Sequence, residues 1–154
     1  QSTAQGITKG YNMKLVVASD EKTPLTDFVI DYLKSKGAEI ILIGDLKNKN
    51  GKWVEIGVKA AKMVADKKAD QGVLFCSSGT GITMAANRIK GARAALCWTP
   101  QIAKLARKWD NANILVMALV NTKKRSAKEI VDVWFDTEFD EEGLNEVHKL
   151  DKAF

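Results

Sequence analysis

The sequence predicts an α/β fold with a five-stranded parallel sheet covered by helices on both faces. Five short, almost uninterrupted apolar segments recur along the 154 residues, and amphipathic segments with helix-start signals separate them. Continuous apolar segments of about four to eight residues are typical of strands that are buried on both faces, as in a parallel sheet. The alternation with helices therefore favours one doubly wound, three-layer, Rossmann-like domain.

The expected strands are, in chain order, KLVVA (14–18), EIILIG (39–44), GVLFC (72–76), RAALC (93–97) and NILVMA (113–118). Thr23–Pro24 and Thr99–Pro100 each place a capping hydroxyl before a proline, which is typical of the first residues of a helix. Gly37 marks the end of the helix that follows the first strand. Ser126 and Glu129 have the spacing of a capping box for the helix after the last strand.

The domain is expected to cover 13–154 and to end in a helical tail beyond the acidic segment 138–142. We interpret 1–12, which is polar and precedes Met13, as a leader or tag remnant without fixed structure. No apolar stretch approaches the roughly 20 residues of a membrane span. Two cysteines are too few for a disulfide framework. A cytoplasmic protein with no membrane partner is the expectation.

The net charge of +5 suits an anionic small molecule and also suits plain solubility. No nucleic-acid partner is expected, because the sequence lacks an aromatic-plus-basic strand motif and a recognition-helix signature. Metal binding is not expected either, since one histidine, His148, and two distant cysteines give no ligand spacing.

The residues around Cys76 carry the clearest chemical signal. Ligands of parallel α/β sheets bind beyond the carboxyl ends of the strands, and Cys76 ends the third expected strand. Gly79 and Gly81 let the backbone approach an anion closely, and the start of the next helix stabilises a thiolate. A thiolate facing an anion cradle is suited to taking a proton from the carbon beside a carbonyl. The alternative is that Cys76 is a small buried apolar side chain and the glycines only turn the chain.

A dinucleotide site does not fit the same loop. Gly79 and Gly81 have the right spacing, but Met84 occupies the third glycine position, and the loop follows the third strand rather than the first. No cofactor is therefore expected.

Four segments resemble the ribose-5-phosphate isomerase B family, which includes the galactose-6-phosphate isomerase subunits. They are ASD (18–20), CSSGTGITMAANRIKGARAALC (76–97), DNANIL (110–115) and AKEIVDVWFDTEF (127–139). The resemblance covers nearly all of 13–140. It implies an aldose–ketose isomerase that acts on a sugar phosphate or related sugar through a cis-enediolate. It also implies active sites at a subunit interface, hence a homodimer or tetramer, with a hetero-oligomer as an alternative.

The resemblance also assigns roles to residues of this chain. Cys76 matches the proton-transferring cysteine, and Ser78 stands where the family usually has an assisting threonine. The expected substrate-binding residues are Asp20, Glu21, Ser77, Gly79, Gly81, Trp109, Asp110 and Asn111. Asn113 matches the last asparagine of the family's HNDAN motif.

Several positions depart from the family pattern. Glu21 follows Asp20 where the family often has histidine, and Trp109 replaces the histidine that helps to open the sugar ring. Trp53 replaces a tyrosine, Val120 replaces an arginine, and the tail EEGLNEVHK (141–149) lacks the arginines of the family's GGRHxRR. Phosphate would then need other cations, for which the candidates are Lys22, Lys123, Lys124 and Arg125.

The intact Cys76 with its glycine loop favours one hypothesis, and the departures from the family pattern favour a second. One is an active isomerase that prefers substrates already in the open-chain form. The other is a non-catalytic member that serves as a sugar-binding module or as the partner subunit of a hetero-oligomeric isomerase. The motifs TP (23–24) and NAN (111–113) resemble the B-type subunit of galactose-6-phosphate isomerase.

Overall fold

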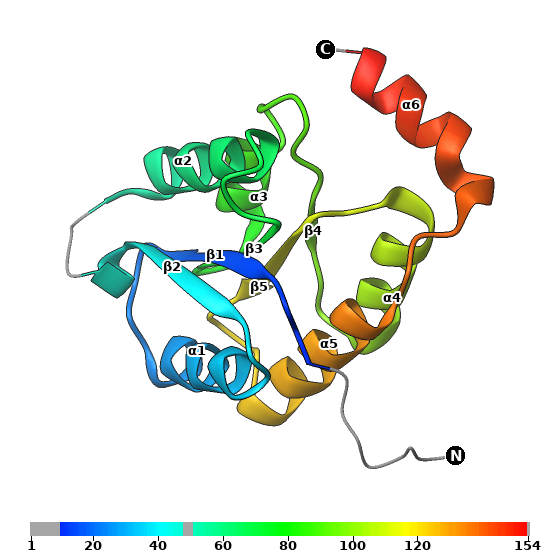
Figure 1. The fold of residues 1–154 in the computed structure, drawn as a ribbon. Coiled ribbons are helices and arrows are strands. Elements are labelled where there is room, and N and C mark those ends of the chain that lie inside the picture. Colours follow the sequence, from blue (N-terminus) through cyan, green and yellow to red (C-terminus); the bar gives the residue numbers. More distant parts are fainter. Residues whose placement is uncertain (1–9, 48–50, 154) are drawn as a thin grey trace, which may run out of the picture.

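A computed structural model describes residues 10–47 and 51–153, and Figure 1 shows the three-layer α/β domain that they form. The strands are β1 (Lys14–Ser19), β2 (Glu39–Gly44), β3 (Gln71–Cys76), β4 (Ala94–Leu96) and β5 (Ile114–Ala118). They form one sheet in the order β2-β1-β3-β5-β4, and each pair is parallel. Each strand lies within one residue of its predicted bounds, so the predicted fold class is confirmed.

Helices cover both faces of the sheet (Figure 1). The helices are α1 (Pro24–Ser35), α2 (Trp53–Ala65), α3 (Thr80–Ala86), α4 (Pro100–Asp110), α5 (Lys124–Asp136) and α6 (Leu144–Lys152). Short 3-10 turns occupy Asp45–Lys47 and Glu141–Gly143. Successive side chains of the strands point to opposite faces of the sheet and form two hydrophobic cores. One core packs against α1, α4 and α5, and the other packs against α2 and α3. Burial on both faces is the reason that the strands are apolar at nearly every position.

Helix starts follow the predicted capping signals at two places and depart from them at a third. Thr23 and Thr99 cap α1 and α4, accepting hydrogen bonds from Thr26 N at 3.2 Å and Ile102 N at 3.2 Å. The capping box predicted at Ser126 and Glu129 is wrong: α5 already begins at Lys124, and no side chain caps it. A cap contributes only about 1 kcal/mol. The short connection from β5 therefore decides where α5 begins, and the capping preference of Ser126 does not.

The domain begins before Met13. Tyr11 is only 4% exposed, and its backbone N–H donates to Lys36 O at 2.7 Å. Its hydroxyl donates to Asp132 Oδ1 at 3.3 Å, and its ring lies 4.6 Å from that of Phe135. Residues 10–12 therefore belong to the packed domain, which differs from the expectation of a structureless leader over 1–12. Residues 1–9 of that leader lie outside the described residues.

The predicted helical tail is present as α6, which lies at the periphery beside α4 (Figure 1). Asp140 N donates to Lys108 O at 2.8 Å, and Val147 is the buried residue of α6. The ion pair between Arg93 and Asp151, at 3.5 Å, ties α6 to the loop before β4. Within the described residues, no helix is both long enough and apolar enough to cross a membrane.

Candidate active site

The carboxyl ends of β1, β3 and β5 lie level with one another. Ser19 pairs with Phe75, and Cys76 pairs with Ala118. The pairing continues past the strand ends, because Leu119 N donates to Cys76 O and Val120 N donates to Ser77 O, both at 3.0 Å. The loops after these strands are therefore neighbours, and Asp20 and Cys76 are the next residues of adjacent strands.

Cys76 lies at the base of a glycine-rich loop. Its side chain is on the α2/α3 face of the sheet and is 5% exposed, while Ser77 and Ser78 are exposed. Ser78 Oγ and Thr80 Oγ1 share a hydrogen bond of 2.7 Å. Gly79 has a φ of +81°, and a Cβ there would lie 2.5 Å from Leu96 Cδ1. Only glycine fits this position, so the loop conformation depends on it.

Trp53, the first residue of α2, covers the other side of this loop. A Cβ on Gly81 would lie 3.0 Å from Trp53 Cδ2 and Cε3, so the indole ring rests directly on Gly81. Close packing of α2 on α3 at Gly57 supports this arrangement, since a Cβ on Gly57 would lie 3.0 Å from both Ala85 Cβ and Ile82 Cγ1. Trp53 remains 40% exposed. Trp53, which stands where the family has a tyrosine, therefore borders the Cys76 loop.

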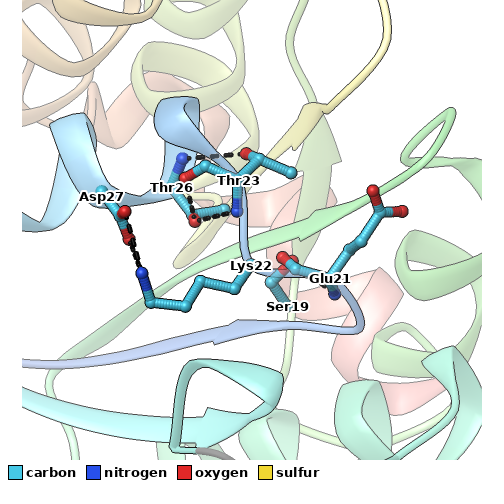
Figure 2. Close-up of polar contacts among 6 residues, drawn as sticks. All are labelled: Ser19, Glu21, Lys22, Thr23, Thr26 and Asp27. Atoms are coloured by element: carbon cyan, nitrogen blue, oxygen red, sulfur yellow. Dashed lines mark hydrogen bonds and ion pairs between the residues drawn. The ribbon is translucent and has the colours of Figure 1, made fainter.

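Asp20 lies in the turn after β1. Its Oδ1 is buried and has no hydrogen-bond partner among the described residues. Burial is the main cause that raises the pKa of Asp20 above its usual value, and the carboxylates of Glu21 and Asp45 add to it, whereas the backbone N–H of Asp20 opposes it. Glu21 is exposed. Figure 2 shows that the Ser19 hydroxyl closes this turn onto Glu21. The sequence motifs gave no role to Ser19 or Asp45, although a serine that ends a buried strand is a detectable signal.

Trp109, Asp110 and Asn111 lie at the opposite end of the sheet, beside the amino ends of the strands. Helix α4 runs back from the carboxyl end of β4 to the start of β5, and its 11 residues span roughly 16 Å. Asn111 ends α4 with a φ of +49°, and its carbonyl accepts from Arg93 Nε at 2.8 Å. The predicted site residues therefore split into two groups within one chain. The sequence does not reveal this split, because the spacing of residues along the chain does not tell at which end of the parallel strands each residue lies.

One member of this second group faces a cavity of about 380 Å³ near the amino ends of β4 and β5. Asp110 lines this cavity, and burial raises its pKa above the usual range. Asn113, which sequence analysis placed with the HNDAN motif, has a structural role here. Its Oδ1 accepts from Arg93 N at 2.7 Å, and its Nδ2 donates to Gly91 O at 2.9 Å.

The candidate phosphate cations are all exposed, and most of them already have neighbours. Lys22 Nζ lies 2.8 Å from Asp27 Oδ1, and Arg125 Nε lies 3.5 Å from Glu129 Oε1. Lys124 Nζ lies over the ring of Phe28. Within 10–47 and 51–153, no three His, Cys, Asp or Glu side chains gather as a metal ion would require.

Comparisons with known proteins match this architecture. The family model described as Ribose/Galactose Isomerase matches residues 15–152. The chain belongs to this family. A ribose 5-phosphate isomerase structure from Thermotoga maritima superimposes with a TM-score of 0.86 at 35% identity, covering 92% of this chain and 99% of that one. The resemblance inferred from the sequence motifs is thereby confirmed.

Two curated relatives show the range of the ribose/galactose isomerase family. A D-erythrulose-4-phosphate isomerase from Pectobacterium atrosepticum is 32% identical over 83% of this chain and 84% of its own length. Galactose-6-phosphate isomerase subunit LacB from Clostridium acetobutylicum is 34% identical over 72% of this chain and 64% of its own length.

Proposed function

We propose that this protein is an aldose–ketose isomerase that acts on a sugar phosphate or related sugar, with Cys76 as the base. The observation that carries the proposal is that three features lie together at the carboxyl ends of β1 and β3. These are the Cys76 thiol, the glycine loop that turns over it, and the Asp20 carboxylate oxygen that has no donor among the described residues. Membership of the ribose/galactose isomerase family supports the same chemistry.

In the proposed reaction, the Cys76 thiolate takes a proton from the carbon next to the substrate carbonyl. The electron pair of that C–H bond moves into a carbon–carbon double bond, and the carbonyl oxygen becomes an enediolate oxygen. Backbone N–H groups of the 77–81 loop stabilise this oxygen. Cys76 then returns the proton to the former carbonyl carbon, and the hydroxyl proton moves to the enediolate oxygen. Ser78 assists Cys76, and Asp20 accepts a hydrogen bond from a sugar hydroxyl.

We propose that a second subunit completes the site. Trp109, Asp110 and Asn111 are too far from Cys76 within one chain to act with it, because they lie at the other edge of the sheet. Four exposed apolar residues, Trp98 just before α4 and Ile102, Leu105 and Trp109 on its outer face, follow one another at intervals of three or four residues. A homodimer or tetramer would bury these residues and bring the two edges together.

A second candidate function, partner subunit of a hetero-oligomeric isomerase, is favoured by the amino edge of this chain. Trp109 cannot accept a proton at neutral pH. Arg93 and Arg107 are committed within the fold, the first to Asn111 O and Asp151 and the second to Ala112 O. Both guanidinium groups are therefore already used within the fold, which leaves Lys90 as the other cation that lines the cavity near the amino ends of β4 and β5. A different chain with more cations at this end of the sheet would complete the Cys76 site. The similarity to the LacB subunit agrees with this alternative.

Proton exchange in heavy water, followed by NMR across aldoses, ketoses and their phosphates, tests the proposed function. We expect exchange beside the carbonyl of at least one of these sugars. Cys76→Ala should lower kcat by several orders of magnitude, while the matched variant Cys97→Ala, at the other cysteine, changes it by less than about tenfold. Turnover by Cys76→Ala within tenfold of wild type would contradict the mechanism.

Light scattering distinguishes the two assemblies. A dimer or tetramer at micromolar concentration that is active alone supports the homo-oligomer. A chain that is inactive alone, and that gains activity when mixed with a related subunit, supports the hetero-oligomer. A monomer that is active alone contradicts the composite site.

A further inference from the structure

Ser19, the last residue of β1, has a buried hydroxyl with two hydrogen bonds to one neighbour. The side chain has no exposed surface. Its Oγ accepts from Glu21 N at 3.1 Å and donates to Glu21 O at 2.5 Å (Figure 2). Both bonds reach across Asp20, so they close a tight turn with Asp20 at its centre.

The two ends of this turn are fixed independently. On one side, Ser19 pairs with Gly44 in β2 and Phe75 in β3. A Cβ at Gly44 would lie 2.5 Å from Ser19 O, so only a glycine allows this close approach. On the other side, the capping box of Thr23 and Thr26 starts α1 (Figure 2). Between these two ends, the Ser19 hydroxyl holds Asp20 and Glu21, while Lys22 is paired with Asp27 of α1.

The turn sets the environment of Asp20. Neighbouring strands lie about 4.8 Å apart, and the register makes Asp20 and Cys76 the next residues of two adjacent strands. Asp20 Oδ1 is buried without a hydrogen-bond partner among the described residues. A buried acceptor without a donor is costly, so an unrestrained Asp20 side chain would turn towards water.

We propose that Ser19 is a positioning residue, whose hydroxyl holds the turn so that the free carboxylate oxygen of Asp20 stays beside Cys76 to accept a sugar hydroxyl. The inference rests on the proposed function, and Ser19 itself touches no substrate. Sequence analysis assigned no role to this serine, and its burial and hydrogen bonds are visible only in the fold.

An NMR titration of the Asp20 carboxyl carbon tests the inference in the free protein. Burial raises the Asp20 pKa, and the carboxylates that face it are Glu21 and Asp45, while Lys22 is paired with Asp27. Ser19→Ala releases the turn and admits water to Oδ1, so the Asp20 pKa should fall by at least about half a unit. The control Ser35→Ala removes an exposed serine hydroxyl that donates to Tyr32 O, and it should leave the titration unchanged. An unchanged Asp20 pKa in Ser19→Ala would overturn the inference.

A double-mutant cycle provides the kinetic readout. Ser19→Ala should raise KM about tenfold and change kcat far less, because a binding group is displaced while the base stays in place. In the Asp20→Asn background, Ser19→Ala should add less than about a twofold loss, since its effect passes through Asp20. Full additivity would instead show that Ser19 acts only through stability.

Ser19→Cys keeps a side chain of similar size and weakens both hydrogen bonds, so it serves if Ser19→Ala does not fold. It should move the Asp20 pKa and KM in the same directions, and an unchanged pKa in this variant also refutes the inference. A wild type that turns over no sugar would remove the proposed function, whereas the NMR titration would still decide the role of Ser19.

Discussion

Replacement of Gly79 by alanine tests whether the loop over Cys76 has the geometry described. Gly79 has a φ of +81°, and an added Cβ would lie 2.5 Å from Leu96 Cδ1 and 3.4 Å from Val116 Cγ1. Gly37 is the matched control, because its φ is +93° and an added Cβ would meet nothing within 4 Å. The two substitutions share the backbone strain and differ in the steric clash.

The expected losses follow from these distances. A left-handed backbone costs a non-glycine residue about 1–2 kcal/mol, and the lower entropy of the unfolded chain returns about 0.4–1 kcal/mol. Gly37→Ala should therefore destabilise the fold by about 1 kcal/mol. Gly79→Ala must also displace the Leu96 side chain, which adds about 1–3 kcal/mol. At about 2–4 °C per kcal/mol for a chain of this size, Tm should fall by about 2–4 °C for Gly37→Ala and by about 4–16 °C for Gly79→Ala.

Calorimetry measures the two Tm values, and proton exchange in heavy water measures the activity at a temperature where both variants are folded. Gly79→Ala should lose most of its exchange activity, because the N–H groups of the loop shift away from the enediolate oxygen. Gly37→Ala should keep it, since Gly37 follows α1 at the far end of the domain from Cys76. Equal Tm values for the two variants, or full activity in Gly79→Ala, would refute the geometry.

Three further predictions concern other residues. Burial raises the pKa of the Cys97 thiol to about 12, so at pH 8 only about 10⁻⁴ of this thiol is ionised. Peptide mapping after iodoacetamide treatment should therefore show that Cys76 is modified first. Faster modification of Cys97 would reverse the two roles. Because Trp109 offers no proton-accepting group, wild-type kcat/KM should be higher for a four-carbon ketose phosphate than for ribose 5-phosphate. Trp109→His should raise kcat/KM for ribose 5-phosphate. Equal kcat/KM of the wild type for the two substrates would contradict this prediction. Partial burial raises the pKa of Asp110, although the residue stays largely exposed, so its charged form destabilises the fold only slightly and stability falls as pH rises through that pKa. Asp110→Asn should therefore raise Tm slightly at pH 7 and lose this gain at about pH 2.5, and a Tm below that of wild type at pH 7 would contradict the raised pKa.

Much of the candidate site at the carboxyl ends of the strands could be predicted from the sequence. An apolar run that ends in a cysteine, followed by two serines and two glycines, predicted the β3–loop–α3 unit, and the structure has it at Cys76 to Thr80. The ASD motif likewise placed Asp20 directly after a strand. Such features are local, because strand ends and glycine turns depend on neighbouring residues. The start of α5 was mispredicted, since a local capping preference is weak compared with the connection that the sheet imposes.

The sequence by itself determined the fold class, the family and the residues at the end of each strand. Only the tertiary structure decided which of those residues are neighbours. It placed Asp20 beside Cys76 through the pairing of β1 with β3, laid Trp53 on Gly81 through the packing of α2 on α3, and separated Trp109 from both. The physical reason is that periodicity records which side chains are buried, whereas strand order and helix direction arise from long-range packing that no local segment contains.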